Sequence, residues 1–155
     1  MAVRADKSTD RTELDSHADT IVGGANCVLL KAGNETATVH SFSHESKPFK
    51  HVPIGTIATA WVDPKSGETF ILEFPESLYF GDRMSHTLLC PNQLRAHGLI
   101  VNDVPCQFDE RSTHSIQVLA DYGGTEIEIP LEMNGVISYS SSHRPTDVEL
   151  RNCVH

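Results

Sequence analysis

The sequence predicts an all-β domain, and three features of the chain support this prediction. Short apolar runs rich in β-branched and aromatic residues recur along the chain, interrupted by Gly, Pro, Asn and Ser, which is typical of strands joined by turns. In the run 69–74, Phe70, Leu72 and Phe74 alternate with other residues, as expected for one face of a strand. Only one segment is a good helix candidate. At 155 residues the chain is long enough for a single domain with its own core.

The N-terminal part of the chain is expected to form three short strands after a polar, frayed start. These strands are expected around Leu14, around Val22 and over 28–30. The GGAN sequence at 23–26 consists of turn-forming residues, so we expect it to connect the last two strands.

Two hairpins are expected to follow. In the first, the runs 36–42 and 49–61 flank the polar, proline-containing sequence SHESKP. In the second, the runs 57–62 and 69–74 flank DPKSG, whose Asp, Pro and Gly favour a tight turn.

The helix candidate lies in the C-terminal half, at 91–97. Pro91 stands near its start and Gly98 stands where a helix commonly ends. Two further strand pairs are expected, 99–101 with 115–119 and 125–131 with 135–139. The predicted organisation is a flexible N-terminal segment 1–12, one domain over 13–140 and a C-terminal tail over 141–155.

Charge and composition argue against several classes of function. The chain has 12 basic and 21 acidic residues, a formal charge of −9, and no basic cluster, so no nucleic-acid partner is expected. The start MAVRADKSTDRTE has no apolar stretch, so neither a signal peptide nor a membrane anchor is expected. No later run approaches the roughly 18 apolar residues of a spanning helix.

Cysteine and histidine spacing bears on cofactors and location. The four cysteines are scattered without a CxxC pair, which favours reduced, mostly buried thiols in an intracellular, cytoplasmic protein. The nine histidines show no HxH or HExxH spacing. We therefore predict no cofactor and no metal, with a site assembled from scattered histidines as the alternative.

The sequence ELDSHADT, residues 13–20, places Asp15 between an apolar residue and the hydroxyl residue Ser16. A short turn after a strand would present the Asp15 carboxylate outward, and the Ser16 hydroxyl could bond backbone across a mirrored copy of the loop. This is the arrangement of an aspartic protease, although the short pattern alone is common by chance. The sequence HTLLCPNQLRAHG, residues 86–98, strengthens the interpretation because an apolar pair there leads into a helix that would support the loop from behind.

LDSHAD resembles the D-[ST]-G-A-[DS] active loop of retropepsins, and LLCPNQLRAHG resembles the hydrophobic stretch, helix and glycine near the end of that fold. The chain is most similar to the protease segment of copia-type retrotransposon polyproteins, through the ordered blocks ELDSHADT, GETFILEFPESLYFGD, HTLLCPNQLRAHGLIVNDVP and RPTDVEL. The resemblance covers roughly residues 13–153. It implies a retropepsin-like closed β-barrel with a flap hairpin and one short helix, functional as a homodimer.

The resemblance also implies roles for single residues. Asp15 matches the catalytic aspartate, and Ser16 matches the hydroxyl that braces the two loops. Ala18 and Asp19 match the residues that follow, at the substrate. The hairpin 39–54 takes the place of the flap, which makes His44 near its tip a candidate substrate contact.

The implied activity is that of an aspartic endopeptidase. Because one chain carries one such loop, a complete site needs a two-fold homodimer with Asp15 from each subunit. Two close carboxylates share a proton. One activates a water that attacks a carbonyl of the peptide or polyprotein substrate, and the other protonates the carbonyl oxygen.

His17 stands where most retropepsins have glycine, which allows close approach of backbone. Beside the two aspartates, an imidazolium would favour their ionised forms and act in the catalytic group. Alternatively, the side chain turns outward and bonds backbone or Asp19. Two other functions therefore stay open: a domesticated enzyme, encoded from its own Met1, that uses Asp15, His17 and Asp19 as acid–base groups on a small molecule, and a catalytically silent dimerisation module.

Residues outside the loop are expected to have structural roles. We expect Asp82 to lie in a turn and His86 at the end of a strand. Trp61 is expected to pack in the core, and Cys27 and Cys90 are expected to be buried, unreactive thiols. Asn92 and Gln93 are expected to cap the helix or to lie on the surface.

Overall fold

The structure is a computed structural model that describes residues 11–16, 18–40, 47–119 and 127–155. Strands make up most of the described chain, which confirms the all-β prediction. Its two α-helices, α1 (Pro91–Ala96) and α2 (Asp147–Asn152), have six residues each, and η2 (Gly81–Arg83) is a single turn of 3₁₀-helix.

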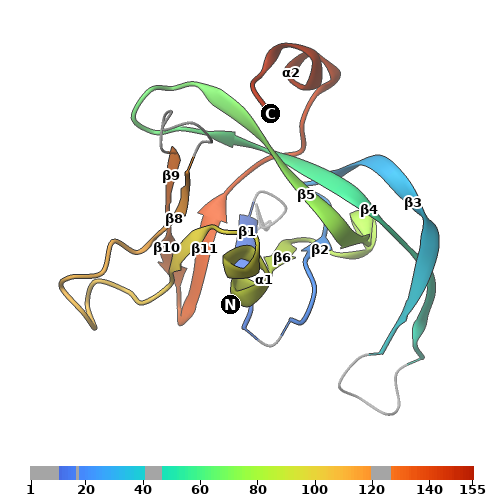
Figure 1. The fold of residues 1–155 in the computed structure, drawn as a ribbon, viewed down its shortest axis with the longest axis horizontal. Helices are drawn as coiled ribbons and strands as arrows, with labels where there is room; N and C mark the ends of the chain where they lie inside the picture. The colour runs from blue at the N-terminus through green and yellow to red at the C-terminus, as the bar shows by residue number, and fades with distance from the viewer. Residues whose placement is uncertain (1–10, 17, 41–46, 120–126) are drawn as a thin grey trace, which may run out of the picture.

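The strands form two sheets (Figure 1). The larger sheet has eight strands in the order β10-β11-β1-β6-β2-β5-β4-β3. Its strands are β1 (Arg11–Leu14), β2 (Val22–Gly23), β3 (Val28–Val39), β4 (Phe49–Val62), β5 (Thr69–Tyr79), β6 (Thr87–Leu89), β10 (Glu132–Asn134) and β11 (Ile137–Ser141). The smaller sheet has the order β7-β8-β9, with β7 (Ile100–Asn102), β8 (Ser115–Val118) and β9 (Ile127–Pro130). Within the described ranges both sheets are open, and no closed barrel is found.

The β4–β5 hairpin forms around the turn expected from DPKSG. The Asp63 backbone N–H donates to the Glu68 carbonyl at 2.8 Å, and the Lys65 N–H donates to Asp63 Oδ1 at 2.9 Å. Gly67 has φ +73°, a conformation that glycine adopts without strain. The turn prediction is confirmed, although β5 continues to Tyr79, beyond the predicted end at 74.

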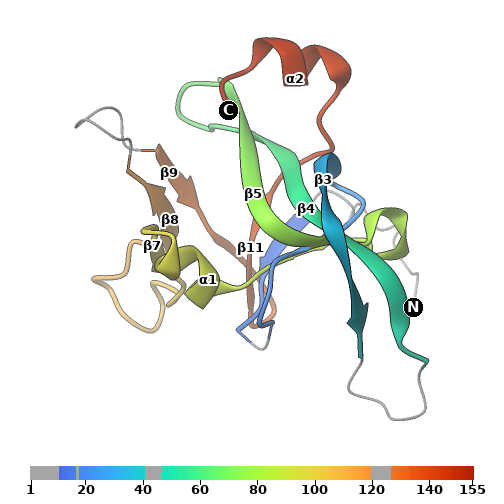
Figure 2. The same ribbon diagram turned by 45° about the vertical axis from the view of Figure 1, so that its right-hand side comes forward.

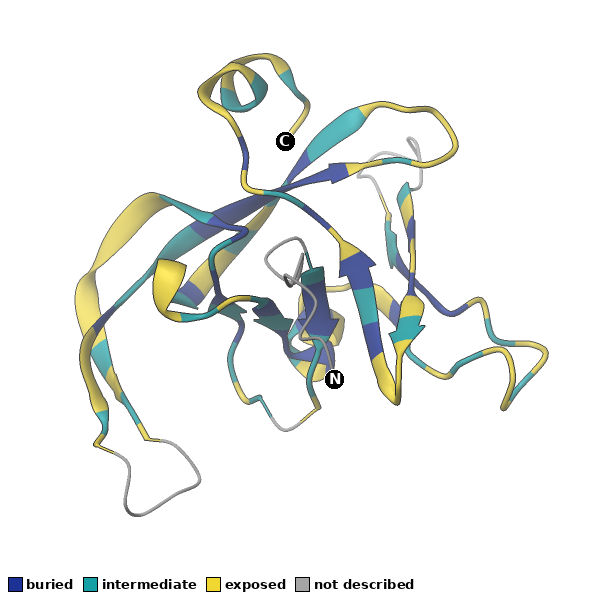
Figure 3. Ribbon diagram, turned by 180° about the vertical axis from the view of Figure 1, so that it is seen from behind, coloured by how far each residue is buried: buried dark blue, intermediate teal, exposed yellow. Residues whose placement is uncertain are grey.

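The β3–β4 hairpin is longer than predicted and projects from the rest of the molecule (Figures 1 and 2). The segments 28–30 and 36–39, expected to belong to separate strands, are parts of the single strand β3. Register shifts between Leu29 and Lys31 and between Ala32 and Thr36 allow one strand to continue through the intervening polar residues. The outer part of β3 is mostly exposed (Figure 3).

The pairing predicted for the C-terminal strands is half correct. β7 pairs with β8 as expected, but β9 pairs with β8, whereas β11 pairs with β10 and β1. Pro130 ends β9 and has no N–H for a further ladder bond. The Leu131 N–H still donates to the His114 carbonyl at 2.9 Å, and the chain then joins the large sheet at β10.

The predicted helix is confirmed as α1, with Pro91 at its first turn and Gly98 at φ +89° after it. The second helix, α2, was not predicted and lies in the expected C-terminal tail. The Thr146 side chain and Glu149 form a reciprocal capping box at its start. The segment after α2 pairs with β5, because the Ile71 N–H donates to the Val154 carbonyl at 2.7 Å.

The main core lies between the large sheet and the layer formed by α1 and the small sheet. Its buried members are Ile21, Cys27, Ile57, Trp61, Leu89, Cys90, Leu94, Val101, Ile116, Ile129 and Leu131. Trp61 packs against Phe70 with ring centroids 6.0 Å apart. The core role of Trp61 and the burial of Cys27 and Cys90 are thus confirmed, whereas Cys106 is exposed.

Candidate active site

The Asp15 loop connects two strands that share one neighbour. β1 ends at Leu14, β2 begins at Val22, and β6 lies between them in the sheet. β6 runs parallel to β1, with Leu14 opposite Leu89, and antiparallel to β2, with Val22 opposite Leu88. A distant part of the chain is therefore inserted at the base of the loop.

Both ends of the loop are held by the segment that contains β6 and α1. The Asp15 N–H donates to the Leu89 carbonyl at 2.9 Å. At the other end, the buried Ile21 N–H donates to Gln93 Oε1 of α1 at 2.8 Å. Gln93 therefore does not have the capping or surface role predicted for it. Because α1 follows β6 directly, one continuous segment holds both ends of the loop.

The described loop residues differ in exposure. Asp15 and Ala18 are half-buried, and Ser16 and Asp19 are exposed. The Ala18 N–H donates to the Asp15 carbonyl at 3.2 Å, which makes a turn directly after the aspartate. Two predicted site residues, His17 and His44, lie outside the described residues, so the two alternatives for the His17 side chain remain as predicted.

A buried polar network lies at the start of β1 and β6 and centres on Asn26, which is 1 % exposed. Asn26 Nδ2 lies 3.0 Å from the Arg11 carbonyl, 3.0 Å from Thr12 Oγ1 and 2.9 Å from Ser142 Oγ. The Thr87 hydroxyl donates to Asn26 Oδ1 at 2.6 Å. Satisfied buried networks of this kind favour one arrangement of the strands, here β1, β6 and the segment after β11.

The predicted GGAN turn packs closely against neighbouring parts of the chain. A Cβ added to Gly24 would lie 2.1 Å from the His86 carbonyl oxygen, and one added to Gly23 would lie 2.7 Å from Ile57 Cδ1. The Gly24 N–H donates to the Thr87 hydroxyl at 3.1 Å. Because Gly23 and Gly24 have no side chains, the turn can lie close to Ile57 and to the backbone of the segment that precedes β6.

A group of charged side chains occupies β1 and the start of β6. Glu13 is 9 % exposed, and its Oε1 lies 3.4 Å from Arg11 Nη2 and 3.8 Å from His86 Nε2. Arg11 also stacks over the Tyr139 ring at 5.4 Å. His86 thus sits at the strand end as predicted and has polar contacts with this group. Asp82 is exposed in η2, as expected of a turn residue.

The β3–β4 hairpin is attached near its far end. Phe49, the first residue of β4, contacts Phe80 edge-on with centroids 5.3 Å apart. The Arg83 guanidinium lies over both rings, at 5.8 Å and 5.1 Å. This contact fixes one arm of the hairpin against η2.

Other chemistries find little support in the described residues. Burial raises the pKa of the Cys27 thiol from 9.0 to about 11, so this thiol is protonated and unreactive at neutral pH. Among residues 11–16, 18–40, 47–119 and 127–155, no three His, Cys, Asp or Glu side chains are grouped as metal ligands. No helix in these ranges has the length and apolar character needed to cross a membrane.

Comparison of the chain with protein-family models, curated proteins and solved structures finds no match. The function proposed below therefore rests on the geometry of the site.

Sequence reasoning missed two residues that shape this site. Gln93 and Asn26 act through bonds to residues 72 and 116 positions away, and no local pattern indicates such contacts. Only the positions of these residues in the sequence could have indicated their roles. Asn26 ends the GGAN turn, and Gln93 lies in the helix that was expected to support the loop.

Proposed function

We propose that this chain is a retropepsin-type aspartic endopeptidase that acts as a homodimer. In each active site, Asp15 from one subunit faces Asp15 from the other, and together they hydrolyse a peptide bond. One carboxylate removes a proton from a water that attacks the peptide carbonyl, and its protonated partner donates a proton to the carbonyl oxygen. The first aspartate then passes the proton taken from the water to the leaving amine as the C–N bond breaks, and the second recovers its proton as the new carboxyl group forms.

The insertion of β6 between β1 and β2 is the observation that carries this proposal. An aspartate used as an acid–base group needs a fixed position. Here the Asp15 N–H and the Ile21 N–H are bonded to the β6–α1 unit at 2.9 Å and 2.8 Å. The half-buried Asp15 sits where the strand ends, beside the exposed Ser16 that would reach the second subunit.

The β3–β4 hairpin supports the same function. A peptidase of this type closes a hairpin over its substrate to exclude water. The hairpin projects from the body of the molecule (Figure 2), and it follows the loop by only a few residues in the chain. Ala18 and Asp19 would lie along the bound peptide.

The test is hydrolysis of a peptide library by the wild-type protein and by Asp15→Asn, from acidic to neutral pH. We expect cleavage by the wild type and a loss of at least about a thousandfold in the variant, since the acid–base pair is removed. Asp82→Asn changes an exposed turn aspartate of the same type and serves as the matched control. Proteolysis that persists in Asp15→Asn would exclude the proposal. A dimer that cleaves no peptide would favour the silent dimerisation module.

A further inference from the structure

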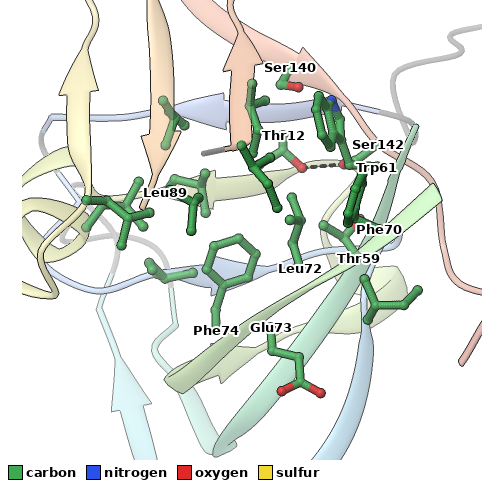
Figure 4. Close-up of a pocket in the computed structure, with 18 of the residues that line it drawn as sticks. Thr12, Thr59, Trp61, Phe70, Leu72, Glu73, Phe74, Leu89, Ser140 and Ser142 are labelled. Atoms are coloured by element: carbon green, nitrogen blue, oxygen red, sulfur yellow. Dashed lines mark hydrogen bonds between the residues drawn. The ribbon is translucent and has the colours of Figure 1, made fainter. Parts of the chain in front are cut away.

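A partly open cavity of about 310 Å³, lined mainly by apolar side chains, lies between the β4–β5 hairpin and the small sheet (Figure 4). Thr12 of β1 lines it, and Asp15 does not. Successive residues of a strand face opposite sides, so the cavity lies on the other side of β1 from Glu13 and its partners Arg11 and His86. The cavity reaches Ile21 and Leu89 at the base of the Asp15 loop, but Asp15 itself is not among its lining residues.

The walls come from both sheets and from α1. Trp61, Phe70 and Leu72 of the β4–β5 hairpin form one wall. Ile116 and Ile129 of the small sheet also line the cavity. Aromatic and aliphatic side chains with few polar groups are typical of sites for small apolar molecules.

The volume indicates the size of the occupant. An engineered protein cavity of about 150 Å³ with similar walls stays dry and binds benzene. The present cavity has about twice that volume, which suits a compact molecule of two rings. Wall atoms that face empty space lack dispersion contacts, and such a molecule would supply them.

The polar groups that line the cavity indicate which chemical groups an occupant can carry. The hydroxyls of Thr12, Thr59 and Ser142 are already hydrogen-bonded to protein groups. Ser140 lies opposite Thr12 in the sheet and is 8 % exposed, and its hydroxyl has no partner among the described residues. At the rim, the Glu73 carboxylate bonds His155 at 2.7 Å and would repel an anion.

We propose that this cavity binds a neutral, two-ring apolar molecule that carries one hydroxyl or carbonyl group. Its rings lie between the walls formed by Trp61 and Ile129. Its polar group bonds the Ser140 hydroxyl. The site does not depend on the proposed peptidase function.

The test measures binding of 2-naphthol and of naphthalene to the full chain. Trp61 is the only tryptophan of the sequence, so quenching of its emission reports occupancy of the cavity directly. We expect saturable quenching by both probes with one site per chain by calorimetry. Ser140→Ala should weaken 2-naphthol binding by about two- to tenfold, the range of one hydrogen bond, and leave naphthalene binding unchanged.

Val118→Phe fills the cavity from β8 and should abolish binding of both probes. Val136→Phe makes the same change at a residue that is 93 % exposed and should bind as the wild type does. Circular dichroism checks that each variant folds. If Val118→Phe does not fold, methyl chemical shifts of the wild type give the same test, and we expect probe-induced changes at Ile116 and Ile129. No saturable binding, equal binding by folded Val118→Phe, or shift changes only outside the lining would overturn the proposal.

Discussion

At the scale of single residues, the site depends most on Asn26. The residue is 1 % exposed, and its side-chain amide bonds groups from β1, β6 and the segment after β11. A buried polar group costs free energy unless its partners are present. The position of β1, and with it Asp15, therefore depends on one amide whose partners lie far apart in sequence.

Asn26→Ala should lower the free energy of unfolding by about 3 kcal/mol, because it leaves the Thr87 hydroxyl and the Arg11 carbonyl without their partner in a buried place. Urea denaturation followed by circular dichroism measures this change. Asn134→Ala, at an exposed position of β10, should cost less than about 0.5 kcal/mol. Equal losses of unfolding free energy in the two variants would show that the hydrogen bonds of Asn26 do not stabilise the fold.

At the scale of elements, α1 acts on the Asp15 loop through Gln93. We expect Gln93→Ala to reduce peptide hydrolysis and to cost about 1 to 2 kcal/mol of stability, since the buried Ile21 N–H loses its acceptor. Gln93→Glu keeps an acceptor oxygen at this position and should restore part of the activity. Asn92→Ala, one residue earlier and exposed, is the matched control. Full activity of folded Gln93→Ala would contradict this positioning role.

The start of α2 should respond to acid through Glu149. Hydrogen bonding to the Thr146 backbone N–H, with a smaller contribution from His143, holds the pKa of Glu149 below its ordinary 4.5. Because this pKa is lower in the folded state, the stabilisation is present above the ordinary value and is lost as pH falls through the lowered value.

Glu149→Gln keeps an acceptor for the Thr146 N–H and removes the charge, so it should lower stability at neutral pH by about 0.5 kcal/mol and flatten the loss of stability on acidification. Urea unfolding at a series of acidic pH values measures both effects. Glu128→Gln, at an exposed position of β9, should keep the wild-type pH dependence. A wild-type dependence of stability on pH in Glu149→Gln would contradict the contribution of the Glu149 carboxylate.

Elements defined by local chemistry were predictable from the sequence. Asp63 and Gly67 determine the β4–β5 turn, and Pro91 and Gly98 bound α1. The capping box of Thr146 and Glu149 is also a local signal, but a helix of six residues in a polar tail is marginal alone. Its stability comes from packing on β5, which the sequence does not show.

Features that depend on contacts between residues far apart in the chain could not be predicted from local sequence patterns. The continuity of β3 depends on bulges, and β9 pairs with β8, which is separated from it by residues 119–126. In the site, Asp15 was predicted from its motif, whereas Gln93 and Asn26 act through tertiary contacts.

At the scale of the whole molecule, the central claim is that two chains build one site. A single chain supplies one Asp15 loop on an open sheet, and the proposed chemistry needs two carboxylates. A two-fold dimer would bring the same loop of each subunit to the axis. The activity would then depend on protein concentration, because dilution separates the subunits.

The most direct test is the activity of an equimolar mixture of wild-type and Asp15→Asn chains after joint refolding. If every site needs Asp15 from both subunits, random pairing leaves about one quarter of the activity of wild type at the same total concentration. If one chain forms a complete site, about one half remains. A value near one quarter is the predicted result, and a value near one half would contradict the shared site.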